Sequence, residues 1–234
     1  TSRRTKATRR LLPRQIEHLA LLPTPAAQPH LAFSKGLPKG QTSHVICNAV
    51  SSSPQLLRTK SRAVPIRLVY AGRLSIEKDP LLLVAALRLL PDTFNLTMVG
   101  DGPLMAQIQS AGYDLVKAGR LQLVGYQPWA VERYRDFDMS ILASHFEGCP
   151  LAALESISAG VPCVGIAIPA MVEIFGSGAP FLLAKERSAE SLAKIVQTVA
   201  AMSHDAMQQD LVRIALRYQV SNFSKHWLQL VRSC

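Results

Sequence analysis

One short segment of the sequence combines two carboxylates with a turn that can begin a helix. It reads Phe146-Glu147-Gly148-Cys149-Pro150-Leu151-Ala152-Ala153-Leu154-Glu155, so seven residues separate the two glutamates. Gly148 frees the backbone, and Pro150 suits the first position of a helix. The N–H groups at a helix start have no partner within the helix and bind phosphate readily. Glu147 before the helix and Glu155 in its second turn would accept hydrogen bonds from hydroxyl groups beside that phosphate, which suits a sugar nucleotide.

The spacing of the two glutamates also fits a simpler interpretation. One would be an exposed loop residue and the other an exposed helix residue, because most charged side chains lie in solvent. The choice between these interpretations therefore depends on what the rest of the chain places nearby.

A second segment places two cations on a loop that leads into a helix. It reads Gly72-Arg73-Leu74-Ser75-Ile76-Glu77-Lys78-Asp79-Pro80. The forked guanidinium of Arg73 and the mobile ammonium of Lys78 could hold a diphosphate and stabilise the charge that grows on a leaving group. The alternative is that both are solvated surface cations, one of them paired with Glu77.

A third segment, Gly100-Asp101-Gly102-Pro103, predicts a tight turn before another helix. Glycines let a backbone approach a ligand closely, but the same residues are equally common in turns that bind nothing. The sequence contains no Gly-x-Gly-x-x-Gly dinucleotide fingerprint and no Gly-Lys-Ser/Thr phosphate loop.

Alternating strand and helix patterns from residue 64 onward predict how these loops are positioned. They indicate an α/β fold, with a doubly wound, mostly parallel, Rossmann-like sheet of six strands and a C-terminal helical extension. Ligands bind beyond the carboxyl ends of such strands, so the loops after the first, second and fourth strands should line one crevice. The predicted strands are 66–71, 96–99, 121–124, 139–143, 162–166 and 181–184. The predicted helices are 80–90, 104–111, 128–134, 150–159 and 171–175, with a longer helical region from 189 to about 230.

Residues 1–63 follow no such pattern. Five prolines between residues 13 and 38 interrupt any long element, which leaves one helix at 13–22 and one short strand at 44–47. Residues 51–63 have the serine-rich and basic composition of a linker. This segment is too short and too interrupted to bury a second large core.

The composition limits the class of protein. A chain of 234 residues with 48% hydrophobic content can bury a substantial core, and no apolar run reaches the length of a membrane-spanning helix. The basic start lacks the apolar stretch of a signal peptide, so we expect a soluble, cytoplasmic protein. Four cysteines without a Cys-x-x-Cys pair predict neither a disulfide framework nor a structural metal; they are Cys47, Cys149, Cys163 and Cys234.

The net charge of +10 is concentrated at the start of the chain. Six cations precede the first acidic residue, Glu17; they are Arg3, Arg4, Lys6, Arg9, Arg10 and Arg14. This arm has no interleaved aromatic residues and no recognisable nucleic-acid module, so no specific nucleic-acid partner is expected.

Together the motifs resemble the carboxyl-terminal half of retaining glycosyltransferases with two Rossmann domains (GT-B), the family often called family 4. The resemblance rests on Gly72-Arg73 with Lys78, then Gly100 to Pro103, then the segment from Ser144 to Glu155, and finally Ala159-Gly160-Val161-Pro162. It covers about residues 30–232, since 32–36 and 45–50 are similar to the last strand of an amino-terminal domain and an Asn-centred hinge.

The resemblance implies roles for individual residues. Arg73 and Lys78 would bind the donor diphosphate and stabilise it as it leaves, Glu147 would contact hydroxyls of the donor sugar, and Glu155 would hold the ribose. We class Arg73, Lys78 and Glu147 as catalytic. Tyr126, in the loop after the third strand, would lie near the base, or would instead be a core aromatic. The expected donor-binding residues are Gly72, Gly100, Asp101, Gly102, Pro103, Tyr126, Phe146, Gly148, Cys149, Pro150, Leu151 and Glu155.

Two features depart from this family. The segment Ile168-Pro169-Ala170-Met171-Val172-Glu173 keeps a glutamate but lacks the two glycines of the usual turn. The amino-terminal acceptor domain is largely missing from the sequence, so no histidine can be assigned a catalytic role. The predicted division is a remnant of that domain and hinge at 1–50, a linker at 51–63, a donor-binding domain at 64–218 and a C-terminal helix at 219–234.

The resemblance also implies partners. The donor would be a nucleotide-diphosphate sugar, the acceptor a saccharide or a lipid-linked saccharide, and no metal or other cofactor would be needed. The C-terminal helix has an apolar face with Trp227 and Leu230. This face either packs on its own domain or, if it is exposed, makes a peripheral contact with the inner face of the membrane. The alternatives are a nucleotide-sugar-binding module without turnover and a flavodoxin-like or receiver-like domain, which would need an acidic cluster where Arg73 and Lys78 stand.

Overall fold

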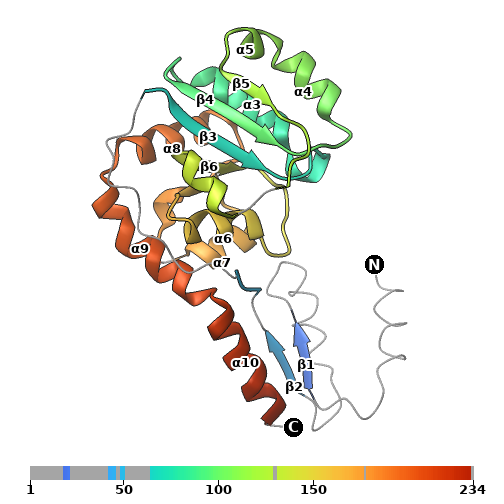
Figure 1. The fold of residues 1–234 in the computed structure, drawn as a ribbon, viewed down its shortest axis with the longest axis vertical. Coiled ribbons are helices and arrows are strands. Elements are labelled where there is room, and N and C mark those ends of the chain that lie inside the picture. Colours follow the sequence, from blue (N-terminus) through green and yellow to red (C-terminus); the bar gives the residue numbers. More distant parts are fainter. Residues whose placement is uncertain are drawn as a thin grey trace.

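Six parallel strands form the central sheet, in the order β5-β4-β3-β6-β7-β8 (Figure 1). This computed structural model describes residues 18–21, 42–45, 48–50, 64–128, 131–176 and 178–232. The strands are β3 (Ile66–Ala71), β4 (Phe94–Val99), β5 (Leu121–Leu123), β6 (Met139–Leu142), β7 (Cys163–Ile166) and β8 (Leu183–Ala184). The predicted α/β class, strand number and doubly wound sheet are confirmed.

The sheet changes direction between β3 and β6, which are neighbours in the sheet but far apart in the chain. Leu68 and Val69 of β3 pair with Met139 and Ser140 of β6. From β3 the chain builds outward through β4 and β5, and from β6 it builds the other way through β7 and β8. Such a reversal leaves a crevice beyond the carboxyl ends of the two central strands, where open α/β sheets bind ligands.

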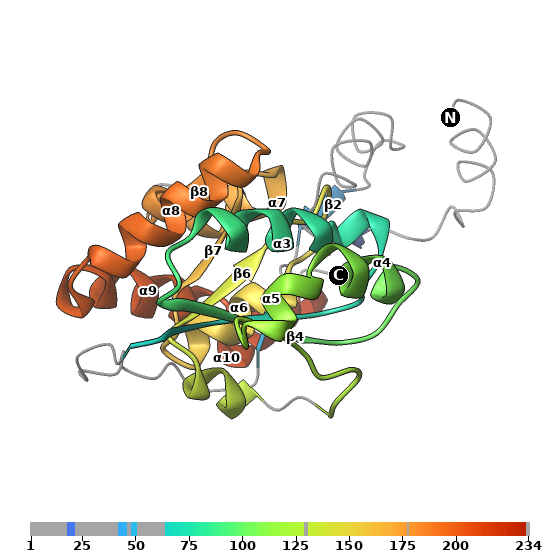
Figure 2. The same ribbon diagram turned by 90° about the horizontal axis from the view of Figure 1, so that it is seen from above.

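Both faces of β3 are buried, which explains its run of apolar residues. Leu68 and Tyr70 lie in the main core, whereas Val69 faces a second cluster with Val99 and Tyr134. Right-handed crossovers on the two sides of the switch put the following helices on opposite faces of the sheet. Figure 2 shows α3 (Pro80–Leu89) on one face and α6 (Leu151–Ser158) on the other.

The remaining helices extend these two layers. α3 packs against α4 (Met105–Ala111) and α8 (Ala189–Ala201), and α4 packs against α5 (Tyr113–Lys117). α6 packs against α9 (His204–Arg217) and the 3-10 turn η2 (Val131–Asp136). α7 (Pro169–Phe175) connects β7 to a short 3-10 turn, η3 (Pro180–Leu182), before β8.

The C-terminal extension is confirmed as helical. It divides into α8, α9 and α10 (Val220–Arg232), the last of which carries Trp227. At the junction of α9 and α10, Val50 forms an isolated parallel bridge with Gln219, and its N–H donates to the carbonyl of Tyr218 at 2.9 Å. The segment before the sheet and the segment after α9 are therefore joined side by side.

One early element differs from its prediction. Residues 18–21 form a strand, β1 (His18–Leu21), which pairs in parallel with β2 (Thr42–Val45), so the helix expected at 13–22 is wrong over these four residues. Strand pairing depends on a partner more than 20 residues away, which local helical spacing does not reveal. The short strand predicted at 44–47 exists but begins at Thr42. The basic arm, residues 32–36 and the linker 51–63 lie outside the described residues.

Smaller differences concern element type and length. The helix expected at 128–134 is the 3-10 turn η2, and two short elements, α5 and η1 (Ile76–Lys78), were not predicted. The last strand contains only two residues, because Pro180 begins a 3-10 turn where the strand was expected to start. None of the described helices is both long enough and apolar enough to cross a bilayer.

Candidate functional site

A cavity of about 760 Å³ opens at the carboxyl ends of the central strands. The loops after β3, β4 and β5 form its walls, together with one residue of η2 and one of α6. The residues that line it are Ala71, Gly72, Arg73, Val99, Gly100, Asp101, Tyr126, Gln127, Tyr134 and Glu155. The predicted crevice exists with the loop after the third strand as an additional wall, but the loop after the fourth strand does not line it; only Glu155, in the helix that follows that loop, does.

Glycines allow the loops after β3 and β4 to pack against each other. Gly100 has a φ of 143°, and a Cβ atom there would lie 1.8 Å from the carbonyl oxygen of Gly72. A Cβ at Gly102 would lie 2.3 Å from the carbonyl oxygen of Leu74. The hydrogen bond from Gly72 N–H to the Val99 carbonyl, at 2.9 Å, continues the strand pairing into these loops. The structure thus gives these glycines a reason besides ligand approach: the loops need their small size.

Arg73 reaches the cavity from a backbone that Tyr70 supports. The Tyr70 hydroxyl donates a hydrogen bond of 2.6 Å to the Arg73 carbonyl, and burial raises the pKa of this tyrosine, so it stays neutral. This hydrogen bond therefore holds the backbone between the buried strand β3 and Arg73 in place. Arg73 brings a permanent positive charge to one wall of the cavity.

Glu155 lies on the opposite element, in the second turn of α6. The helix begins at Leu151, one residue later than expected, and Pro150 precedes it as the N-cap residue without a side-chain cap bond. Burial raises the pKa of the Glu155 carboxyl. A desolvated carboxylate in the same cavity as a guanidinium is suited to accept hydrogen bonds from the hydroxyls of an anionic ligand.

Glu147 is engaged elsewhere, because it pairs with Lys78. The Lys78 ammonium lies 2.6 and 2.7 Å from the two carboxylate oxygens, and the Ser144 hydroxyl donates to the same carboxylate at 2.6 Å. The Glu147 side chain is only 10% exposed and that of Lys78 28%. Of the two glutamates, Glu155 lines the cavity and Glu147 joins two loops, so the structure separates the roles of the pair. Lys78 pairs with Glu147 rather than with Glu77.

Of the other predicted residues, Tyr126 lines the cavity, whereas those of the segment 146–151 do not. Tyr126 is 78% exposed and lines the cavity, so the alternative that it is a core aromatic is wrong. Phe146 is 63% exposed, Gly148 and Leu151 are exposed, and Cys149 is half-buried against the core. Pro103 follows Gly102 at the turn before α4 and completes the set.

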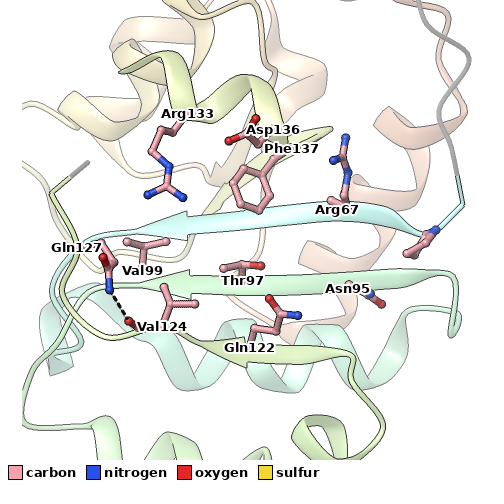
Figure 3. A pocket seen from close by; sticks show the side chains of 11 residues that line it. Arg67, Asn95, Thr97, Val99, Gln122, Val124, Gln127, Arg133, Asp136 and Phe137 are labelled. Carbon is pink, nitrogen blue, oxygen red and sulfur yellow. Dashed lines mark hydrogen bonds between the residues drawn. The ribbon is translucent and has the colours of Figure 1, made fainter. Parts of the chain in front are cut away.

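A second cavity of about 530 Å³ adjoins the first along one face of the sheet (Figure 3). Val99 and Gln127 line both cavities, and Gln127 donates its amide N–H to the Val124 carbonyl at 3.2 Å. Polar side chains from neighbouring strands point into it, including Asn95, Thr97 and Gln122.

Sequence reasoning missed several residues of the site. Tyr134 and Gln127 line the cavity, and Arg187 and Asp79 form a partly buried ion pair beside the Lys78–Glu147 pair. Tyr134 and Arg187 stand in segments without a motif. Only the position of Arg187 after a strand's carboxyl end could have indicated it.

The sequence of this chain matches a protein family of known class. The family described as Glycosyl transferases group 1 matches residues 58–215. The chain belongs to this family. The resemblance to glycosyltransferases is therefore confirmed at the level of family, and the fold of the carboxyl-terminal half of GT-B enzymes is confirmed by the sheet and its neighbours.

Two curated relatives show how far the similarity extends. Lipopolysaccharide 1,6-galactosyltransferase of Salmonella typhimurium is 30% identical over 152 residues, which cover 58% of this chain and 42% of that protein. Amylovoran biosynthesis glycosyltransferase AmsK of Erwinia amylovora is 28% identical over 224 residues, covering 88% of this chain and 53% of its own length. The chain thus spans about half the length of these relatives or less.

Solved structures support the fold. Anabaena HepE, in complex with UDP and glucose, superposes with a TM-score of 0.77 at 17% identity, covering all of this chain and 68% of that one. The lipopolysaccharide outer core galactosyltransferase WaaB, in its apo form, gives a TM-score of 0.67 at 21% identity, with 93% and 62% of the two chains covered. At these identities the likeness concerns the fold alone.

Proposed function

We propose that this chain binds a nucleotide-diphosphate sugar in the 760 Å³ cavity and supplies the donor half of a retaining, family 4-like glycosyl transfer. The observation that carries the proposal is that Arg73, from the loop after β3, and Glu155, from α6, line one cavity at the switch point of the sheet. A cation for phosphate and a desolvated acceptor for hydroxyls are the two chemistries such a donor requires.

The proposal assigns each wall to a part of the donor. Arg73 binds the diphosphate, Glu155 accepts hydrogen bonds from the ribose hydroxyls, and Tyr126 covers the base from the rim. The N-terminus of α6 would face the phosphates with the positive end of its dipole, because the N–H groups of Leu151 and Ala153 already donate to the carbonyls of Cys149 and Pro150. Glu147 contacts the donor sugar when Lys78 turns from it toward the diphosphate.

The transfer step places no proton on a side chain. The acceptor hydroxyl attacks the anomeric carbon from the face on which the diphosphate departs, so the configuration is retained. A new carbon–oxygen bond to the acceptor forms, the bond to the phosphate oxygen breaks, and the acceptor proton passes to the leaving phosphate. Arg73 and Lys78 stabilise the charge that develops on this phosphate, as preorganised cations do.

In this proposal the two cations and the helix dipole act without a divalent metal. Wild-type protein should bind UDP with the same affinity in 5 mM magnesium chloride and in excess EDTA, by isothermal titration calorimetry. Loss of UDP binding in EDTA that magnesium restores would contradict a metal-free site.

The proposed acceptor is a saccharide or a lipid-linked saccharide, and the proposed location is the cytoplasm, with contact at the inner face of the membrane. The net charge of +10 and the exposed Trp227 and Leu228 on α10 support a membrane contact. We expect the chain to sediment with vesicles that contain anionic lipid at low salt and to dissociate at high salt. Sedimentation that is equal with neutral vesicles would contradict the electrostatic part of this contact.

The central experiment measures donor binding with a matched pair of variants. Glu155→Gln removes the carboxylate charge in the cavity, whereas Glu190→Gln removes an exposed charge on α8. Titration with UDP and UDP-sugars should show weaker binding for Glu155→Gln, by roughly 10-fold for one lost charged hydrogen bond, and wild-type affinity for Glu190→Gln. Equal affinity of wild type and Glu155→Gln for every donor would overturn the assignment.

A second function uses the same cavity without turnover. The pairing of Lys78 with Glu147 favours it, because the cation is neutralised within the protein. A nucleotide-sugar-binding module would bind the donor but transfer nothing, even when combined with the amino-terminal half of a relative. Transfer in that combination would instead favour the enzyme.

A further inference from the structure

Asp79 occupies an unusual backbone position at the end of the loop after β3. Its φ of 48° and ψ of 53° are left-handed, and no other non-glycine residue in the described part of the chain has a positive φ. Such a conformation is sterically unfavourable for a residue with a Cβ atom and persists where surrounding contacts hold it. Asp79 directly follows Lys78 and precedes α3.

The Asp79 carboxylate does not serve the helix that it precedes. Aspartate at an N-cap position commonly accepts a hydrogen bond from the first turn, but α3 has no side-chain cap bond. The carboxylate instead accepts from the guanidinium of Arg187, 108 residues away, at 3.0 Å. The side chains of both residues are largely buried.

Arg187 connects three segments with one guanidinium. It also donates to the carbonyl of Ala143 at 2.8 Å and to the carbonyl of Ser144. Ser144 is the residue whose hydroxyl binds Glu147. Arg187, from the segment between β8 and α8, therefore contacts the neighbour of Lys78 on one side and the support of Glu147 on the other.

His145 strengthens the same junction. Its backbone N–H donates to the Glu77 carbonyl at 2.8 Å, and its Nε2 lies 3.4 Å from the Asp79 carboxylate. The loop after β3 and the loop after β6 are thus joined through backbone and side chain directly beside the Lys78–Glu147 pair.

We propose that Arg187 and Asp79 are positioning residues that hold these two loops in register for donor binding, acting through Lys78 and Glu147. This rests on the proposed function. The guanidinium suits the task because its planar fork donates in several fixed directions at once, which an ammonium cannot do. The contacts of the partly buried Asp79 carboxylate with Arg187 help to keep Asp79 in a conformation that glycine would adopt freely.

The test uses two variants that should weaken binding alike but differ in their effect on stability. Asp79→Gly relieves the left-handed backbone but removes the contact with Arg187. We expect its Tm to equal or exceed that of Arg187→Ala, while both weaken UDP binding at least five-fold by calorimetry. Arg187→Lys should recover only part of the affinity. Arg213→Ala, which removes an exposed pair with Asp210 on α9, should bind as wild type does.

Hydrogen exchange tests the same proposal without a ligand. In Arg187→Ala and Asp79→Gly, the amides of Lys78 and His145 should exchange at least ten-fold faster, while those of β3 and β7 keep their rates. If wild type binds no nucleotide but these two amides exchange faster in the variants, the proposed function fails and the positioning role stands. Unchanged exchange at both amides, or wild-type UDP affinity in both variants, would overturn the positioning role.

Discussion

Lys78 and Glu147 neutralise each other across two loops, so removing one charge releases the other. In Glu147→Gln the Lys78 ammonium would lose its strongest partner and become available to a diphosphate. A partly buried pair of this kind is worth about 1 kcal/mol, so UDP should bind roughly five-fold more tightly. Transfer in a complete enzyme should fall, because the donor sugar loses its carboxylate.

Calorimetry with UDP checks this prediction, with Asp114→Asn as the control. Asp114 pairs with Arg88 on the surface, and its loss should leave UDP affinity unchanged. Weaker UDP binding by Glu147→Gln would mean that the carboxylate holds Lys78 in its binding position.

The raised pKa of Glu155 should make the stability of the protein depend on pH. Burial raises its pKa in the folded state, so the folded protein holds this proton at pH values where the unfolded chain has released it. Its contribution to stability therefore decreases as pH rises from the ordinary glutamate pKa, about 4.3, through the raised value. Glu155→Gln should raise Tm at pH 7, and the difference should disappear near pH 4. A Tm difference that is the same at both pH values would contradict this account.

The two described cysteines should differ in reactivity. Burial raises the pKa of the Cys163 thiol to about 12, so its thiolate is scarce, whereas Cys149 is half-buried before α6. N-ethylmaleimide should label Cys149 first, and UDP should slow that labelling if phosphate occupies the start of α6. Peptide mass spectrometry measures both sites. Labelling of Cys163 before Cys149 in folded protein would contradict the difference in burial.

At the scale of elements, the loops after β3 and β4 form two walls of the cavity, and glycines let them pack against each other. Gly100→Ala would place a Cβ against the Gly72 carbonyl at a φ that side chains rarely adopt, and we expect it to destabilise the fold by about 3 kcal/mol. Gly119→Ala is the matched control, because Gly119 also has a positive φ but open space around it. Gly119→Ala should lower the free energy of unfolding by about 1 kcal/mol. Urea denaturation measures this quantity for both variants. Equal losses would mean that the contact between the loops is unimportant.

The sequence predicted elements well where the signal was local. β3 was placed at its observed bounds, and Pro80 marked the start of α3, because apolar burial and a proline at a helix start act over a few residues. The strand β1 and the Asp79–Arg187 pair depend on partners far along the chain, so spacing could not reveal them. For the same reason the motif predicted that both glutamates bind the donor. Lys78, 69 residues from Glu147, pairs with Glu147 alone, so the two glutamates differ in their contacts.

At the scale of the whole molecule, α10 contributes little to the rest of the described fold. Its exposed apolar residues include Val220, Trp227 and Leu228, and its packing contacts with the other described elements are few. Removing residues 220–234 should leave UDP affinity within two-fold of wild type and reduce aggregation. Calorimetry and light scattering measure the two effects. A large loss of UDP affinity would show that α10 supports the donor cavity.

The bridge between Val50 and Gln219 brings the two connections of the sheet domain to one place. A domain whose first and last residues are neighbours can be exchanged between proteins as one segment, because the two junctions lie close together and need no new linker. Grafting 51–218 into a relative's framework at these two positions would transfer its donor preference as one block. Within the described residues, the bridge holds the strand side and the helix side of this unit together, so a rotation at Val50 and Gln219 would carry the donor cavity along with the sheet.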